Sequence, residues 1–270
     1  MAERAAHDAG RALKRLAAAA LFAAAAAAHA DSTGYCSPGR PLDASQKDVV
    51  LRFGAAVKAE LERAGSGVAL ISRSGLDLSR FSMRYSHAGL SLRDSADSRW
   101  AVRQLYYACD DQRPRVFDQG ISAFLLGAND AALGYVSIVF LPPEAAAAVE
   151  RRARDDRAAL AVLADRYSAN AYPFALAYQN CNQWVAELMA SAWGDAATRA
   201  EAQAWLQRAG YVPTAFEVGP MIAASLFVPF LHRDDHPEDD LAAGRFKVSM
   251  PASLETFVRQ RWPEATRVEL

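Results

Sequence analysis

The sequence lacks an excess of charge of either sign, and it lacks a metal-binding cysteine pair. Its 270 residues hold 30 lysines and arginines against 31 aspartates and glutamates, which leaves a formal charge of −1. A near-neutral chain carries too weak a field to bind nucleic acid or an acidic membrane surface through charge, so both roles are disfavoured. No C-x-x-C pair is present, which excludes the usual zinc frameworks and disfavours redox work by a cysteine pair.

Long apolar runs are also lacking, because the stretch Leu16 to Ala28 ends after 13 residues. That length is too short to span a bilayer but is typical of a secretory signal. Three basic residues between positions 11 and 15 precede the stretch, and Ala28-His29-Ala30 follows it as a small-residue cleavage site. We therefore predict a signal peptide at residues 1–30 and a periplasmic or secreted protein without stable membrane insertion. The alternative is an Ala-rich cytosolic helix.

Residues 31–270 are long enough for one large domain with its own core. Hydrophobic periodicity predicts a helix from Asp43 to Gly65, with apolar residues at helical spacing, and a last helix over Ala252–Arg261. Between them we expect strands at 68–72, 81–92, 100–109 and 135–141, a helix over 142–164 and an acidic loop at 234–240. The predicted fold class is α+β, with a central antiparallel sheet packed against helices and a C-terminal extension.

The predicted strand over residues 81–92 carries one of three histidines that follow the signal peptide. Its alternation places Tyr85, His87 and Gly89 on one face. A histidine in the middle of a strand has no packing advantage over a β-branched residue. His87 is therefore a candidate functional group.

Cys181 begins the most informative segment of the chain. Asn180 is a good helix N-cap, Gly194 a good stop, and apolar residues recur behind Cys181 at helical spacing. A thiol at a helix N-terminus meets free N–H groups and the positive end of the helix dipole, which favour the thiolate and could hold an oxyanion. The alternative is that Cys181 is a small buried hydrophobic residue.

The remaining cysteines and histidines lead to simpler predictions. Three cysteines in an exported chain leave one unpaired, and we predict a Cys36–Cys109 disulfide because Cys181 has the more reactive surroundings. His232 and His236 have the spacing of a zinc-protease helix, but Arg233 stands where that motif needs Glu. A solvated acidic loop is the better interpretation, so we predict no metal ion and no cofactor.

Four runs resemble an uncharacterised family of exported bacterial proteins, the domain-of-unknown-function family 2145. The resemblance extends over nearly the whole chain after the signal peptide and names no activity. The runs are Arg84-Tyr85-Ser86-His87-Ala88-Gly89, Val102-Arg103-Gln104-Leu105-Tyr106-Tyr107, Phe117-Asp118-Gln119-Gly120 and Tyr178-Gln179-Asn180-Cys181-Asn182-Gln183-Trp184.

A strand with Ser-His-x-Gly, followed about ninety residues later by Asn-Cys at a helix start, more remotely resembles circularly permuted papain-like enzymes. These include NlpC-type peptidases and lecithin:retinol acyltransferase-like enzymes. The resemblance implies Cys181 as nucleophile, His87 as base and a third polar group that orients the imidazole. Gln104 is our first choice for that group, with Asp110 and Tyr107 as alternatives. Many relatives have a histidine or carboxylate there, and this chain has none on the strand.

This arrangement predicts a thiol hydrolase or acyltransferase that attacks an amide or ester and forms an acyl-enzyme. A cell-wall peptide or an acyl lipid fits as substrate, from compartment and resemblance alone. The predicted substrate-binding residues are Tyr85, Gln179, Asn180 and Trp184. The alternative roles of these residues are helix capping and core packing. A catalytically inactive envelope binding protein with the same groove is the second hypothesis.

Overall fold

The computed structural model describes residues 42–95, 98–126, 134–220, 222, 228 and 230–270. The predicted signal peptide and Cys36 lie outside the described residues. A six-stranded antiparallel sheet in the order β4-β3-β2-β1-β5-β8 forms the centre. The strands of this sheet are β1 (Val68–Arg73), β2 (His87–Arg93), β3 (Trp100–Ala108), β4 (Arg113–Gly120), β5 (Val136–Phe140) and β8 (Thr266–Glu269).

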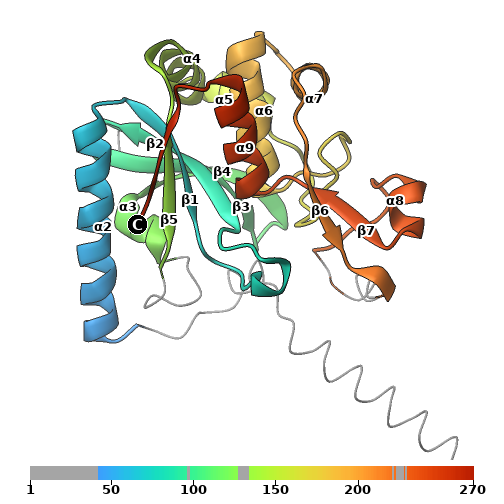
Figure 1. The fold of residues 1–270 in the computed structure, drawn as a ribbon, viewed down its shortest axis with the longest axis horizontal. Coiled ribbons are helices and arrows are strands. Elements are labelled where there is room, and N and C mark those ends of the chain that lie inside the picture. The colour runs from blue at the N-terminus through green and yellow to red at the C-terminus, as the bar shows by residue number, and fades with distance from the viewer. Residues whose placement is uncertain (1–41, 96–97, 127–133, 221, 223–227, 229) are drawn as a thin grey trace, which may run out of the picture.

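Helices cover both faces of this sheet (Figure 1). One face packs against α2 (Ala44–Ala64) and α3 (Ile121–Leu125). The other packs against α4 (Pro143–Arg154), α5 (Asp156–Ala161), α6 (Cys181–Gly194), α7 (Arg199–Arg208) and α9 (Pro251–Arg261). Because successive strand residues point to opposite faces, each buried strand contributes to two hydrophobic cores. The predicted α+β class with a central antiparallel sheet is confirmed at this level.

The first helix follows its sequence signals closely. The Asp43 carboxylate accepts a hydrogen bond from the Gln46 N–H at 2.8 Å, and the Gln46 side chain accepts one from the Asp43 N–H at 3.1 Å. This capping box fixes the start of α2. Gly65 ends the helix with a φ of 72°, a left-handed conformation that glycine adopts without strain. The expected cap and stop are both confirmed.

The strand predicted over residues 81–92 is only half present. Residues Ser79–Phe81 form a 3₁₀ turn, Ser82 has a φ of 56°, and β2 begins at His87. This turn breaks the alternation before His87. The prediction that Tyr85 and His87 share one strand face is therefore wrong.

Two strands of the central sheet, β4 and β8, were not predicted from the sequence, and neither were the two strands of the small sheet described below. β4 is an edge strand in which exposed residues alternate with buried or partly buried ones from Arg113 to Asp118, so it lacks an apolar run. β8 follows α9 and pairs with β5 through the register Ile138↔Val268. The C-terminal tail thus adds a strand to the central sheet. The helix predicted over 142–164 is also broken, because Asp155 caps a new helix at Arg157 and Ala158.

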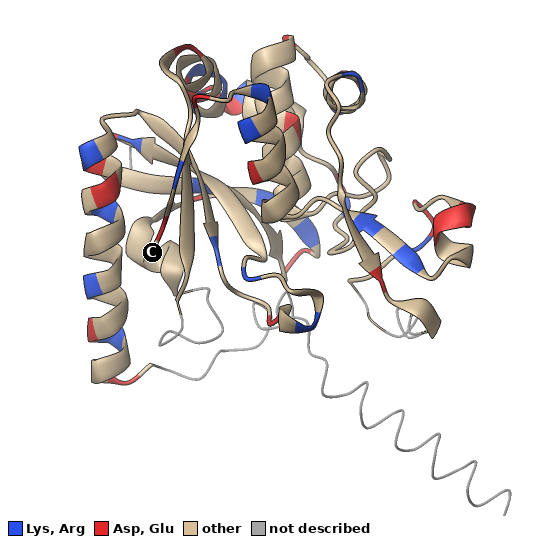
Figure 2. Ribbon diagram, viewed as in Figure 1, with Lys and Arg blue, Asp and Glu red and all other residues tan. Residues whose placement is uncertain are grey.

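A small two-stranded sheet lies beside the main one and consists of β6 (Thr214–Glu217) and β7 (Arg245–Val248), with α8 (Glu238–Ala242) next to it. Figure 2 shows acidic α8 beside basic β7. Asp240 joins them, with Arg245 at 2.7 Å and Lys247 at 3.1 Å. Asp240 and His236 are buried, at 3% and 6% exposure. The prediction of a solvated acidic loop is therefore wrong at these positions.

Within the part of the chain that is described, no helix combines the length and the apolar composition needed to cross a membrane.

Candidate active site

Cys181 is the first residue of α6, as its sequence context predicts. The Asn180 side chain accepts a hydrogen bond from the Gln183 N–H at 2.7 Å and so caps the helix. The N–H groups of Cys181 and Asn182 point at the Cys181 sulfur and favour its thiolate. Cys181 is a free thiol. Because Cys36 is not described, the Cys36–Cys109 disulfide stays a prediction.

Asn182 joins the cysteine helix to the histidine strand. Its Oδ1 accepts a hydrogen bond from the Ala88 N–H at 2.9 Å, and its Nδ2 donates to the Ser86 carbonyl at 3.1 Å. The same Nδ2 donates to the Ser249 carbonyl at 3.1 Å. The Asn182 amide thus hydrogen-bonds to the backbone on both sides of His87 and holds the start of α6 against the start of β2. Sequence reasoning missed this residue.

A chain of amides orients the His87 ring. His87 Nε2 lies 2.7 Å from Gln104 Oε1, and Gln104 Nε2 donates to Gln119 Oε1 at 2.8 Å. Gln119 Oε1 also accepts from the Tyr106 hydroxyl at 3.2 Å. Because Gln119 accepts from both neighbours, Gln104 must present its oxygen to His87. His87 Nε2 therefore carries the proton, and Nδ1 is left as a hydrogen-bond acceptor.

Gly89 explains how β3 comes close enough for this contact. A Cβ on Gly89 would lie 2.5 Å from Val102 Cγ1, 3.0 Å from the Arg103 carbonyl oxygen and 3.2 Å from Gln104 Cβ. Two of these atoms belong to side chains on the same face as His87, and the third is backbone. Because Gly89 has no side chain, β2 and β3 can approach each other closely next to Gln104. The glycine in His-x-Gly is thus required by packing.

Arg73 is the cross-strand partner of His87 and lies on the same face of the sheet. Its guanidinium stands 5.3 Å from the centre of the Phe124 ring, and the His87 ring lies 6.0 Å from the same ring. His87 also stacks on Tyr106, with ring centres 5.1 Å apart. Arg73 is only 5% exposed and His87 only 8%. A positive charge is therefore buried next to the imidazole.

Burial keeps both reactive groups neutral; the charge of Arg73 adds to this effect at His87 and opposes it at Cys181. Desolvation, helped by the charge of Arg73, lowers the pKa of His87 to about 3 although the Gln104 hydrogen bond opposes the change. Desolvation raises the pKa of Cys181 to about 11, against the effects of Arg73 and of the two N–H groups. At neutral pH the resting site holds a thiol and an uncharged imidazole. No ion pair between the two exists before a substrate arrives.

The residues predicted to bind substrate lie in three different environments. Gln179 is fully buried. Its side-chain oxygen accepts a hydrogen bond from the Ala164 N–H, and its side-chain nitrogen donates to the Val162 carbonyl and to Glu187. Tyr85 donates to Glu269 on β8, away from the contacts of His87. The side-chain oxygen of Asn180 accepts the hydrogen bond that caps α6. These contacts favour structural roles for all three residues.

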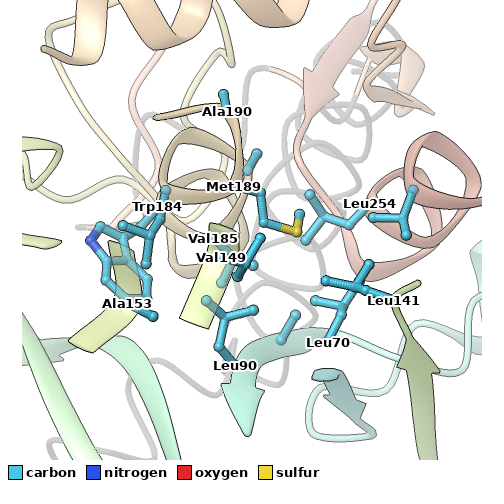
Figure 3. Packing of buried hydrophobic residues seen from close by; sticks show 14 of the residues in the cluster. Leu70, Leu90, Leu141, Val149, Ala153, Trp184, Val185, Met189, Ala190 and Leu254 are labelled. Carbon is cyan, nitrogen blue, oxygen red and sulfur yellow. The ribbon is translucent and has the colours of Figure 1, made fainter. Parts of the chain in front are cut away.

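Trp184 lies in the core between α6 and the sheet (Figure 3). It is 0% exposed, and its indole N–H donates to the Ala159 carbonyl at 3.2 Å. This placement favours the interpretation of Trp184 as a core aromatic residue over a role in substrate contact.

An aromatic group lies near the thiol, and sequence analysis assigned it no role. Tyr167 is close enough for Cys181 to raise its pKa, although burial is the larger cause. Its backbone pairs with Gln179 just before α6. Tyr107 contacts Tyr167 and Phe230, with ring centres 5.3 and 4.9 Å away, while Asp110 is exposed in the turn after β3. Of the three candidates for orienting His87, only Gln104 is described in contact with it.

A second buried polar cluster surrounds Glu187, two turns further along α6. Glu187 is 0% exposed and pairs with Arg199 at 2.8 Å. It also accepts hydrogen bonds from the Gln179, Gln183 and Gln203 amides, at 2.5, 3.0 and 2.7 Å. Arg199 in turn donates to the Leu176 and Tyr178 carbonyls. This Glu187 network fixes the segment that leads into Cys181.

Comparisons with known proteins give one match. No curated protein and no solved structure matches the chain. A family model described as "Uncharacterized protein conserved in bacteria (DUF2145)" matches residues 60–258, a span that includes His87, Gln104 and Cys181. The chain therefore belongs to the DUF2145 family of uncharacterised bacterial proteins.

Proposed function

We propose that this protein is a Cys-His thiol hydrolase or acyltransferase, with Cys181 as nucleophile, His87 as base and Gln104 as the residue that orients His87. The observation that carries the proposal is the 2.7 Å contact between His87 Nε2 and Gln104 Oε1, with Gln104 itself oriented by Gln119. These hydrogen bonds leave His87 Nδ1 as a hydrogen-bond acceptor. Asn182 holds Cys181 against the same strand. A base with a fixed tautomer and a helix-start thiol, joined through the contacts of Asn182 with the backbone around His87, suit acyl transfer.

The proposed reaction starts from the neutral pair. As Cys181 Sγ attacks the carbonyl carbon, its proton passes to His87 Nδ1, and the carbonyl oxygen takes up negative charge. The N–H groups at the start of α6 are available to that oxyanion. His87 then gives the proton to the leaving amine or alcohol, and a thioester on Cys181 remains. Water or an acceptor amine, deprotonated by His87, attacks the thioester, and the proton returns to Sγ.

Export and the finer fold assignment belong to the same proposal. The basic flank, the short apolar run and the Ala28-His29-Ala30 site support secretion, with a periplasmic or secreted location. The order of histidine strand before cysteine helix supports a permuted papain-like arrangement. An envelope location makes a cell-wall peptide or an acyl lipid the proposed substrate.

Acylation of Cys181 tests the proposal directly. The full-length protein is treated with p-nitrophenyl acetate and with a thioester, quenched in acid, and mapped by peptide mass spectrometry. We expect an acetylated Cys181 peptide in the wild type and none in Cys181→Ser. In His87→Gln the rate should fall by about 10²-fold or more, the scale of a lost general base. Absence of acyl-Cys181 from the wild type with both reagents would reject the proposal.

A second candidate function is a catalytically inactive binding protein. The observation that favours it is the neutral resting pair, because a thiol with a pKa of about 11 is a weak nucleophile at neutral pH. In that case Cys181 should alkylate with iodoacetamide at the same rate in the wild type and in His87→Ala. A rate that depends on His87 would exclude this alternative.

A further inference from the structure

The charge of Arg73 acts on both reactive groups. Arg73 pairs with His87 across β1 and β2, and its carbonyl accepts a hydrogen bond from the Ser86 N–H at 3.1 Å. The Ser86 carbonyl in turn accepts from Asn182 Nδ2, next to Cys181. Two consecutive hydrogen bonds therefore join Arg73, the start of β2 and the start of α6. The arginine and the thiol are fixed to the same short stretch of backbone.

The surroundings of Arg73 hold its guanidinium in place. The Phe124 ring of α3 lies 5.3 Å below it, and Nη1 donates to the Ser74 carbonyl at 3.0 Å. At 5% exposure the charge is poorly screened by water, so its field acts strongly on its neighbours. Arginine keeps its charge in such an environment, whereas lysine and histidine can lose theirs.

Tyrosine side chains also face Cys181 and His87. Tyr167 faces Cys181 from the segment before α6, and Tyr106 faces His87 from β3. Within the described residues, Arg73 is the only charged side chain whose field shifts the pKa of either reactive group. It favours the thiolate and disfavours the imidazolium. His87 is thus kept as a neutral base, and Arg73 supplies the positive charge that acts on Cys181.

We propose that Arg73 is the fixed positive charge of the Cys181 site, and that it stabilises the thiolate and selects acyl substrates that carry a negative charge. The substrate part rests on the proposed function. The stabilising part does not, because any reaction of the thiol reports it. A carboxylate close to the scissile carbonyl is the chemistry that this charge would recognise.

Two alkylating reagents of similar size distinguish an effect of local charge on Cys181 from an effect of its accessibility. Iodoacetate is negative and iodoacetamide is neutral, so the ratio of their rates at Cys181, divided by the same ratio for free cysteine, reports the local charge. We expect this normalised ratio to be about tenfold above one in the wild type at pH 8. It should remain high in Arg73→Lys and fall to about one in Arg73→Met. Peptide mapping confines the measurement to Cys181.

Arg103→Met is the matched control, because Arg103 lies on β3 but contacts Asp118 and the Ala153 carbonyl. It should leave the ratio unchanged. A normalised ratio of one in the wild type, a measurement that needs no variant, would overturn the proposal even if Arg73→Met fails to fold. An unchanged high ratio in folded Arg73→Met would do the same.

A second arm compares p-nitrophenyl acetate with the p-nitrophenyl monoester of succinate. We expect the carboxylate ester to acylate Cys181 about tenfold faster in the wild type, an advantage lost in Arg73→Met. If neither ester acylates Cys181 while the iodoacetate preference holds, the proposed function fails and the role of Arg73 as the local charge survives. If both esters acylate at equal rates, the proposed function survives and the substrate inference is rejected.

Discussion

Two buried polar clusters surround α6, and they differ in how they treat charge. The Glu187 network pairs a carboxylate with a guanidinium at 2.8 Å and satisfies both with further hydrogen bonds. The Cys181 site instead keeps its two reactive groups neutral beside Arg73. The charged groups of the Glu187 network pair with each other and stabilise the fold. The Cys181 site leaves a thiol and an imidazole nitrogen able to react.

The largest expected effect breaks the Glu187 network. Glu187→Ala removes the partner of a buried arginine, so the free energy of unfolding should fall by about 3–5 kcal/mol. Urea denaturation measures this loss. The contacts of Arg73 lie outside this network, so in the folded protein the iodoacetate preference of Cys181 should equal that of the wild type. A loss under 1 kcal/mol would show that the network contributes little to stability.

A smaller effect comes from Gly89→Ala, which acts on the Cys181 site through packing. The new Cβ would lie 3.0 Å from a backbone oxygen and 2.5 Å from Val102, so we expect a loss of about 1–3 kcal/mol. The strands must separate, which weakens the Gln104 contact and slows acylation of Cys181.

Gly120→Ala is the matched control for this substitution. A Cβ there would meet only Ser98 Oγ at 3.7 Å, and the φ of −59° suits alanine. Its stability should stay within about 0.5 kcal/mol of the wild type, and acylation should be unchanged. Equal behaviour of the two variants would contradict the packing explanation for Gly89.

The smallest change at each measured step is the pH dependence of stability due to His87, which accumulates over several pH units. Burial lowers its pKa to about 3, so between pH 6.5 and 3 the unfolded chain binds a proton that the folded protein excludes. Stability therefore falls as the pH decreases through this window. The wild type should lose up to about 1.4 kcal/mol per pH unit more than His87→Gln. His236, whose pKa burial also lowers, is present in both proteins and cancels. Equal slopes would contradict the burial of a neutral His87.

Local signals predicted the parts of the fold that depend on neighbours in sequence. The Asp43 cap and the Gly65 stop determine α2, and Asn180 determines where α6 begins, because capping involves residues three positions apart. β4 carries charged and proline residues at a sheet edge and gave no apolar pattern. The 3₁₀ turn at Ser79–Phe81 was hidden because residues 81–86, from its last residue onward, alternate in polarity like a strand.

The candidate site was predictable in its types of residue but not in its connections. Cys181, His87 and Gln104 follow from a helix start, a strand histidine and a neighbouring strand. Asn182 and Gln119 look like ordinary polar residues in sequence, because their importance lies in contacts across 96 and 15 residues. Arg73 ends a strand and looks like a solvent-facing charge. Only the pairing of β1 with β2 brings it next to His87.

The pairing of β8 with β5 has a consequence for synthesis. β5 lies about 130 residues before β8, and Leu270 completes the pairing through hydrogen bonds with Val136 in both directions. While the ribosome is still making the intervening helices, the outer edge of β5 has no partner strand. An open edge of Val136–Phe140 is a template for pairing with another chain. Prompt delivery of the last strand therefore protects the nascent protein from aggregation.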